Sequence, residues 1–163
     1  APGSAPGIPV SLQSILQNVV TLQRSRSSDK ALRIELDIDP ALSLITGDPN
    51  RLMQLFTNLV QNAVDASPQG GHVRVKALED HSHITVQILD EGVGVAPEVR
   101  ERMFEPFLTT KPTGMGLGLS ICREIADAHR ARLILDNRED QPGAKAEVVF
   151  SVVVDADIVP AQA

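Results

Sequence analysis

The sequence predicts an α/β domain of the α+β type, with a mixed, mainly antiparallel sheet covered on one face by three helices. Three segments carry apolar residues at helical spacing, and several others alternate apolar with polar residues as half-buried strands do. Their order along the chain is helix, strand, helix, paired strands, glycine-rich loop, helix and paired strands. This order lacks the regular alternation of strand and helix that a doubly wound parallel sheet requires.

Length and composition indicate one domain with one core. The chain has 163 residues, and 42% of them are hydrophobic, which is enough to fill one core without disulfides or a structural metal. A net charge of −6 and the absence of Trp and Tyr disfavour binding to nucleic acids or anionic membranes. The lone Cys122 cannot form an internal disulfide, which suits a reducing compartment, and we therefore expect a cytoplasmic protein.

The two ends of the chain are expected to be loose. Residues 1–10 have the composition of a linker or leader, so ordered structure should begin near Ser11. The uncharged stretch Ala1–Gln23 is interrupted by prolines and polar residues, which indicates neither a membrane span nor a signal peptide. The folded domain is expected over residues 11–155, with a flexible tail over 156–163.

The first two elements are an amphipathic helix and a strand. Apolar residues recur at helical spacing from Leu12 to Leu22 behind a plausible Ser11 N-cap, which predicts a helix to about Arg24. Residues 32–38 alternate apolar and charged side chains, which predicts a strand with one buried face.

A second helix and a hairpin follow. Asp48 is a good N-cap and Pro49 suits the first turn of a helix, and a run of apolar residues at helical spacing comes next. Pro68–Gly71 ends this helix. Two alternating runs, 73–77 and 84–88, flank a polar turn and predict an antiparallel hairpin.

The last part of the chain begins with a glycine-rich stretch over residues 91–116. It contains one short helix candidate, 98–103. A third long helix is expected over about 117–129, and two strands near 132–135 and 146–153.

The second helix carries an unusual polar face. At about 100° per residue, Asn58, Asn62 and Asp65 lie within roughly 60° of one another, away from the apolar residues. Asparagine favours helix caps and turns, so two asparagines one turn apart inside a helix lower the stability of that helix. A ligand that they bind would explain their presence. The alternative is an ordinary solvated face.

Two glycine clusters stand where phosphate groups are commonly bound. Asp90–Val95 follows a strand directly, and Gly114–Ser120 directly precedes a helix. Closely spaced glycines let backbone N–H groups approach a phosphate, and a helix start adds the positive end of its dipole. Taken singly, each cluster is equally well explained as a turn.

Taken together, these segments resemble the catalytic ATP-binding domain of two-component sensor histidine kinases. The resemblance rests on the asparagine box, first glycine box, phenylalanine box and second glycine box of that family, in the same order and spacing. In this chain they are Asn58 with Asn62, Asp90-x-Gly92-x-Gly94, Phe104-Glu105-Pro106-Phe107 and Gly114-x-Gly116-x-Gly118. The resemblance covers Ser11–Val153 and implies the α/β sandwich of the Bergerat type, shared with gyrases, heat-shock chaperones and mismatch-repair ATPases.

The resemblance also implies roles for individual residues. Asp90 would accept a hydrogen bond from the adenine amino group, which favours ATP over GTP because a carboxylate repels a carbonyl. Asn62 would bind Mg²⁺ through its amide oxygen, and Asn58 would act through the water shell of the metal. The other nucleotide-binding residues that it implies are Gly92, Gly94, Lys111, Gly114, Gly116, Leu117, Gly118 and Leu119.

Two residues bear on catalysis. ATP-hydrolysing relatives carry Glu where this chain has Asn58, and an amide has no useful basicity, so transfer to another acceptor is favoured over hydrolysis. Lys111, in a short lid over residues 108–113, is the best-placed cation for the γ-phosphate, although a solvated lysine is the alternative. Phe104 and Phe107 either anchor the lid, meet the partner domain or pack in the core.

Some positions depart from the family pattern. Asp65 stands where many sensor kinases have Lys, Arg130-Ala131 replaces two glycines, and the third glycine box is reduced to Gly143-Ala144 without a Thr. Cys122 is expected to be a small core residue rather than a nucleophile. No histidine has the sequence neighbours of a phosphoacceptor, and surface or helix-end positions are expected for His72, His81, His83 and His129.

The expected activity is therefore Mg²⁺-dependent binding of ATP and transfer of its γ-phosphoryl group to a histidine. The resemblance implies that this histidine lies on a separate dimerisation domain and that a response regulator is an indirect partner. Two alternatives stay open: a serine kinase of the anti-sigma-factor type, and a nucleotide-dependent binding module without transfer activity. The phenylalanine box and the short lid favour the histidine kinase.

Overall fold

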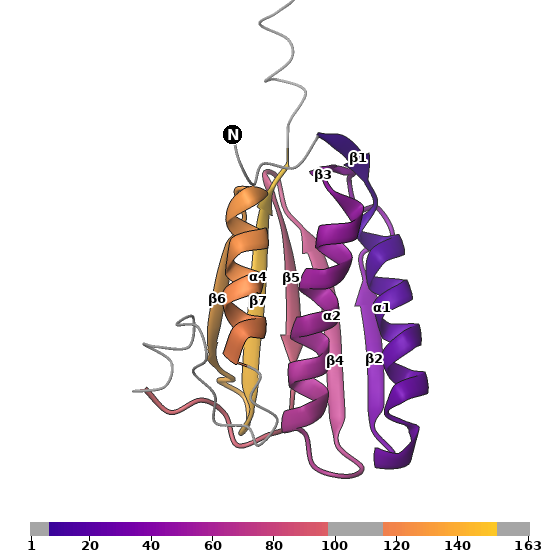
Figure 1. The fold of residues 1–163 in the computed structure, drawn as a ribbon, viewed down its shortest axis with the longest axis vertical. Coiled ribbons are helices and arrows are strands. Elements are labelled where there is room, and N and C mark those ends of the chain that lie inside the picture. The colour runs from indigo at the N-terminus through magenta and orange to yellow at the C-terminus, as the bar shows by residue number, and fades with distance from the viewer. Residues whose placement is uncertain (1–6, 98–115, 153–163) are drawn as a thin grey trace, which may run out of the picture.

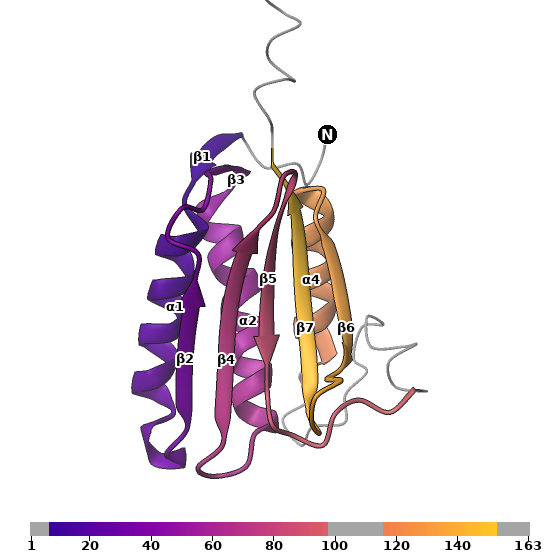
Figure 2. The ribbon, with the colours of Figure 1, turned by 180° about the vertical axis from the view of Figure 1, so that it is seen from behind.

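The computed structural model describes residues 7–97 and 116–152. It has two main layers, a five-stranded sheet and a layer of helices that covers one face of it (Figure 1). Seen from behind, the other face of the sheet carries no helix in the described part of the chain (Figure 2). The predicted mixed sheet with helices on one face is confirmed.

The sheet is mixed, with one parallel pair. In spatial order its strands are β2 (Arg33–Ile38), β4 (His72–Glu79), β5 (His83–Leu89), β7 (Ala144–Ser151) and β6 (Arg132–Asn137). β2 is parallel to β4, and each other pair of neighbours is antiparallel. The predicted hairpin corresponds to β4 and β5, whose alternate apolar residues are buried beneath the helices.

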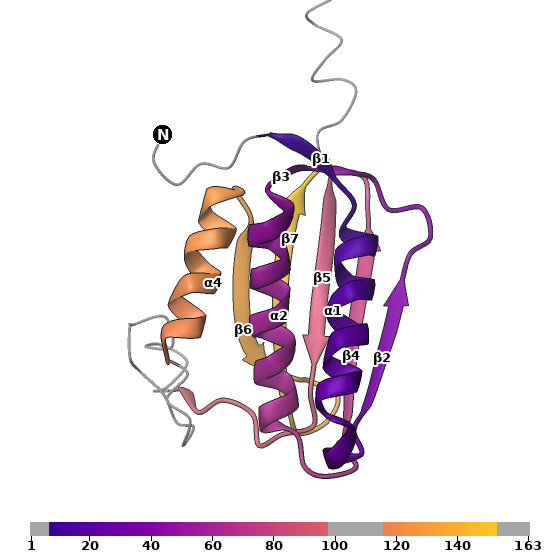
Figure 3. The same ribbon diagram turned by 45° about the vertical axis from the view of Figure 1, so that its right-hand side comes forward.

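The helices pack side by side on this sheet. α2 (Pro49–Ala66) lies between α1 (Leu12–Arg26) and α4 (Gly116–Ala128), and the short 3-10 turn η1 (Ser28–Lys30) follows α1 (Figure 3). Both predicted N-caps are confirmed, because Ser11 Oγ accepts a hydrogen bond from Ser14 N–H and Asp48 Oδ1 accepts one from Asn50 N–H. Among the described helices, none has the length and hydrophobicity needed to cross a bilayer.

A second, two-stranded sheet was not predicted. β1 (Ile8–Val10) pairs antiparallel with β3 (Ile45–Gly47) at the end of the molecule where α1 and α2 begin (Figure 1). Val10 and Ile45 are buried, so this small sheet is part of the core. Ordered structure therefore begins before Ser11, and the interpretation of residues 8–10 as linker was wrong. A three-residue strand contains too few alternating side chains to be predicted from a pattern.

The core lies between the sheet and the helices. Phe56 of α2 packs against Phe150 of β7, with ring centroids 6.2 Å apart. Cys122 of α4 is fully buried, and burial raises the pKa of its thiol to about 12. The thiol therefore stays protonated near neutral pH, and the prediction that Cys122 is a small core residue is confirmed.

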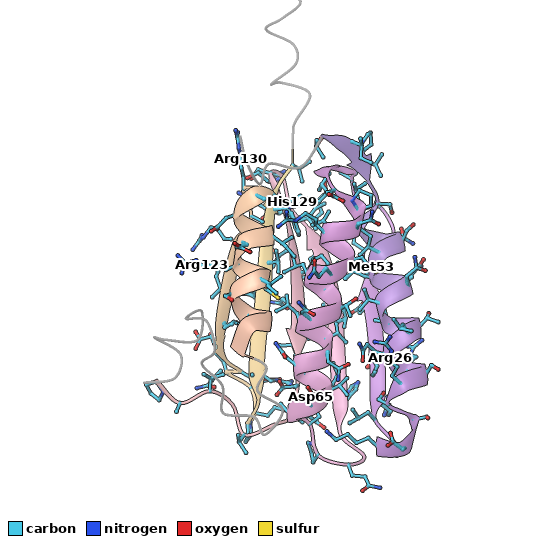
Figure 4. All side chains as sticks on the ribbon, viewed as in Figure 1. Arg26, Met53, Asp65, Arg123, His129 and Arg130 are labelled. Atoms are coloured by element: carbon cyan, nitrogen blue, oxygen red, sulfur yellow. The ribbon has the colours of Figure 1, made fainter. Side chains whose placement is uncertain are left out.

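His129 ties the end of α4 to the start of α2 (Figure 4). Its Nε2 accepts a hydrogen bond from Asp48 N–H at 3.0 Å, and its Nδ1 donates one to the Ile125 carbonyl at 2.8 Å. A Cβ on Gly47 would lie 2.5 Å from Cδ2 of this ring, so only glycine leaves room for it. His129 is thus a helix-end residue, as predicted, and it fixes how α4 lies along α2.

Candidate nucleotide-binding site

One end of the molecule brings the predicted motifs together. The C-terminal end of α2, marked by Asp65 in Figure 4, lies at the same end as the segment after β5 and the described start of α4. A Cβ on Gly92 would lie only 2.6 Å from the Ala66 carbonyl oxygen. The segment after β5 therefore passes directly against the end of α2, and only glycine fits at the contact.

Asn58 and Asn62 of α2 are half-buried rather than freely solvated. The Cys122 thiol of α4 lies beside the Asn58 side chain and donates a hydrogen bond to the Leu55 carbonyl at 3.8 Å, so this side of α2 packs against α4. Asn62 follows one turn later on the same side of the helix. Asp65, by contrast, is exposed, and its carboxylate accepts a hydrogen bond from Gln61 Nε2 at 2.8 Å. Asn58 is therefore not a freely exposed side chain, whereas Asp65 is.

Asp90 has a buried carboxylate that the backbone holds in place. The residue is 5% exposed, at the end of β5. Its Oδ1 accepts hydrogen bonds from the N–H groups of Gly92 and Ala144, both at 2.9 Å. Within residues 7–97 and 116–152, no donor bonds its Oδ2. Oδ1 thus accepts its hydrogen bonds from the protein backbone, while Oδ2 can accept a hydrogen bond from a ligand.

Glu91 holds the next position of the same segment. Its Oε1 accepts a hydrogen bond from His72 N–H at 2.9 Å, and its Oε2 accepts one from Gln141 Nε2 at 3.1 Å. The hydrogen bond from Gln141, followed by that from His72, holds the pKa of Glu91 below its ordinary value. The carboxylate therefore links β4 to the turn between β6 and β7.

Gly94 is explained by its own backbone conformation and by packing. It has a φ of +84°, and a Cβ there would lie 2.7 Å from Asn137 Oδ1. Asn137 in turn binds the backbone of Val95, accepting from its N–H at 2.6 Å and donating to its carbonyl at 3.0 Å. Since packing accounts for both Gly92 and Gly94, their presence alone is no evidence for a phosphate.

The turn between β6 and β7 provides contacts that the sequence analysis missed. Gly143 has a φ of +145°, and a Cβ there would overlap the Asp90 carbonyl oxygen. Asp90 N–H also donates to the Ala144 carbonyl at 3.1 Å. The reduced third glycine box thus lies directly against Asp90. In the sequence, the only sign of this contact is the glycine after Pro142, and one glycine is not enough to predict which residue it touches.

The remaining predicted residues are only partly described. Gly116 and Leu117 open α4, and Leu119 is half-buried one residue beyond Gly118. A Cβ on Gly118 would meet no described atom within 4 Å, so packing against the described residues does not explain this glycine. The following lie outside the described residues: Phe104, Phe107, Lys111, Gly114 and the helix candidate 98–103.

Comparison with known proteins identifies the family. Residues 47–156 match the family described as histidine kinase-, DNA gyrase B- and HSP90-like ATPases. The chain belongs to this family. The matched region contains α2, the Asp90 segment, α4 and the turn between β6 and β7, so it includes every part of the site described above.

The similar proteins are sensor kinases. Sporulation kinase E of Bacillus subtilis (strain 168) is 32% identical over 127 residues, which are 77% of this chain and 17% of that protein. The catalytic domain of histidine kinase ThkA has a TM-score of 0.81 at 28% identity, covering 89% of this chain and 95% of that one. Full-length ShkA in complex with AMPPNP has a TM-score of 0.81 at 28% identity, covering 93% of this chain and 32% of that one. The chain is the catalytic ATP-binding domain of a sensor histidine kinase, and it spans about a sixth of sporulation kinase E.

Proposed function

We propose that this domain binds Mg²⁺·ATP and transfers the γ-phosphoryl group to a histidine on a separate dimerisation and phosphoacceptor domain. The observation that carries the proposal is the buried Asp90 carboxylate, which keeps one oxygen for a ligand at the end of the molecule where α2 ends and α4 begins. The similarity to ShkA, whose structure contains AMPPNP, supports nucleotide binding by this domain.

Asp90 is proposed to select adenine. Its Oδ2 can accept a hydrogen bond from the 6-amino group of adenine, whereas guanine has a carbonyl oxygen at that position. Two acceptors facing each other in a buried site repel and leave both groups without a hydrogen bond. ATP should therefore bind more tightly than GTP.

Asn62 is the proposed magnesium ligand. Mg²⁺ prefers oxygen ligands and usually keeps several waters and phosphate oxygens, so one neutral amide oxygen fits this demand. In residues 7–97 and 116–152, no group of three or more His, Cys, Asp or Glu side chains is arranged to hold a metal. The oxygen ligands of the metal at this site would then be the Asn62 amide and nucleotide oxygens, while Asn58, beside Cys122 on the same side of α2, acts through bound water. When bound, the metal would neutralise phosphate charge.

The proposed acceptor is an imidazole nitrogen rather than water. The Asn58 amide is too weak a base to activate water, so hydrolysis lacks a general base at this position. In the transfer, a lone pair of the acceptor imidazole attacks the γ-phosphorus, and the bond from that phosphorus to the bridging oxygen breaks. ADP leaves, and the imidazole loses its N–H proton to solvent. Lys111 is proposed to neutralise charge on the γ-phosphate during this step.

The start of α4 is the proposed binding site for the phosphates. The N–H groups in the first turn of a helix have no acceptor within the helix and are oriented toward an anion. Gly118 lies in this turn, without a described neighbour that would exclude a side chain. Close approach of a phosphate would explain a glycine here. The proposed nucleotide contacts, besides Asp90, are Gly92, Gly94, Gly114, Gly116, Leu117, Gly118 and Leu119.

Replacing Gly118 by alanine should weaken nucleotide binding without weakening the fold. Alanine favours a helix over glycine by up to about 1 kcal/mol, so the free energy of unfolding should not decrease. A methyl group pressed against the phosphates should lower ATP affinity by about tenfold. Calorimetric titration with ATP and urea unfolding measure the two effects. An unchanged ATP affinity would show that no phosphate lies against Gly118.

The acceptor histidine is proposed to lie on another domain of the parent kinase. His129 uses both ring nitrogens to hold α2 and α4 together, and His72 Nε2 lies 2.8 Å from Glu35 Oε2. ThkA has a structure in complex with the response regulator protein TrrA, which supports a response regulator as the later recipient of the phosphoryl group. We place the domain in the cytoplasm, where ATP is available.

Phosphoryl transfer in trans tests the proposal. The domain is incubated with Mg²⁺, γ-labelled ATP and separate dimerisation domains of related sensor kinases, and we expect acid-labile label on the added domain. The reaction should be slow, because a covalent linkage that would supply an effective concentration of about 1 mM is absent. Acid-stable label on serine would indicate the anti-sigma-factor type of kinase, and ATP binding without any label would indicate a binding module. Stoichiometric self-labelling of this chain would contradict a separate acceptor.

A further inference from the structure

A buried arginine connects the turn between β6 and β7 to Asp90. Arg138 Nη1 donates a hydrogen bond to the Asp90 carbonyl at 3.0 Å, and the arginine side chain is 5% exposed. The backbone N–H of Arg138 donates to the Gly143 carbonyl at 2.9 Å, which closes the turn. A Cβ on Gly143 would lie 3.0 Å from Arg138 Cδ, so the arginine side chain passes over this glycine to reach Asp90.

Asp140 holds the guanidinium in its orientation. Arg138 Nε donates to Asp140 Oδ1 at 3.0 Å, and Nη2 donates to Oδ2 at 2.8 Å, so the two side chains form a two-pronged ion pair. The hydrogen bonds to Asp140 raise the pKa of Arg138 further above its ordinary value, and the guanidinium stays charged. The Asp140 side chain is 67% exposed, so its main effect is on the direction of the guanidinium rather than on the core.

The contacts fix Asp90 on both sides of its Cα. Its N–H donates to the Ala144 carbonyl, and its own carbonyl accepts from Arg138. That carbonyl belongs to the peptide group leading through Glu91 to Gly92, whose N–H holds Asp90 Oδ1. Rotation of this peptide group would withdraw the Gly92 N–H and leave the Ala144 N–H alone to orient the carboxylate. Arg138 is thus placed to hold the backbone that determines where Oδ2 points.

We propose that Arg138 is a positioning residue for adenine recognition, acting through the Asp90 peptide. The inference rests on the proposed role of Asp90 as the acceptor for the adenine amino group. It assigns the orientation of that acceptor to a residue outside the glycine and asparagine motifs. Loss of Arg138 should leave a nucleotide site that binds phosphates but distinguishes the adenine amino group poorly.

A comparison of two nucleotides separates positioning from a merely structural role. Affinities of ATP and of purine riboside triphosphate, which lacks the 6-amino group, are measured by calorimetry for the unmodified domain and for Arg138→Met. We expect ATP affinity to fall by about tenfold in the variant, while the affinity for the analogue changes less than about twofold. Arg132→Met, at an exposed position of β6, is the matched control and should leave both affinities unchanged.

Two further variants keep the test decisive. Arg138→Lys retains the charge and can still donate to the Asp90 carbonyl, so it should recover part of the preference for ATP. Asp140→Asn removes the ionic partner of the guanidinium at an exposed position, so the domain should still fold even where Arg138→Met does not. Asp140→Asn should also lower the preference for ATP over the analogue, by a smaller factor than Arg138→Met does.

The outcomes distinguish this inference from the proposed function. Equal losses for ATP and the analogue in Arg138→Met, or an unchanged preference in both Arg138→Met and Asp140→Asn, would overturn the positioning role. If Asp90→Asn abolishes the preference and the Arg138 variants do not, adenine recognition by Asp90 stands and only the inference fails. If the unmodified domain shows no preference for ATP over the analogue, the proposed role of Asp90 fails first.

Discussion

Replacing Asp90 by asparagine should lower the affinity for ATP by about 10²-fold and narrow the difference between ATP and GTP. The Gly92 and Ala144 N–H groups both point at Oδ1, so the single amide oxygen of the variant must take that place. The amide NH₂ then faces the ligand, and it would meet the adenine amino group donor to donor. The same NH₂ can donate to the guanine carbonyl, which is why the preference should shift toward GTP.

Calorimetric titration of Asp90→Asn with ATP and GTP measures both effects. Asp37→Asn is the matched control, because it makes the same chemical change at an exposed position of β2 and should leave both affinities unchanged. Urea unfolding verifies that the variant is folded under the titration conditions. An ATP affinity equal to that of the unmodified domain would remove Asp90 from the adenine site.

Replacing Asn62 by alanine should reduce phosphoryl transfer by about 10²-fold, through loss of the amide oxygen proposed to bind Mg²⁺. The affinity for Mg²⁺·ATP should fall as well, whereas binding of ADP in the presence of EDTA should change little. Alanine is a better helix former than asparagine, so α2 should keep its structure. Comparing the affinity for Mg²⁺·ATP with the affinity for ADP in EDTA distinguishes a metal ligand from a residue that only contacts the nucleotide.

Asn18→Ala is the control for this substitution. Asn18 lies exposed on α1, so the change in helix propensity is the same while the proposed metal site is untouched. If Asn62→Ala transferred the phosphoryl group as fast as the unmodified domain, Asn62 would be a half-buried surface residue of α2 without a role at the metal. Equal losses of ADP binding with and without metal would point to a direct nucleotide contact instead.

Most helices and strands were predictable because their signals are local. Ser11 and Asp48 cap α1 and α2 as expected, and alternation of apolar residues predicted β4 and β5. The parallel pairing of β2 with β4 was not predictable, since the alternation in residues 33–38 is compatible with either direction. The small sheet of β1 and β3 was missed because pairing of two three-residue strands depends on contacts far apart in the sequence.

The site was predictable in its motifs but not in its supporting contacts. Asp90, Asn58 and Asn62 were recognisable through the resemblance of their motifs to the family pattern, and the fold places them toward the same end of the molecule. The contacts of Gly143 and Arg138 with Asp90 join residues about fifty positions apart, and no local pattern encodes them. The contact of the Cys122 thiol with Asn58 and the Leu55 carbonyl is equally nonlocal, because it depends on how α4 packs along α2.

The relative affinity of the unmodified domain for ATP and GTP, measured by calorimetry with Mg²⁺ and again with EDTA, tests the central claim most directly. Backbone hydrogen bonds fix the Asp90 carboxylate, which is the proposed acceptor for adenine, so ATP should bind more tightly than GTP by at least about 10²-fold, as expected when a buried acceptor loses its donor. Mg²⁺ should strengthen ATP binding through Asn62. Equal affinities for the two nucleotides, with or without Mg²⁺, would contradict adenine recognition by Asp90.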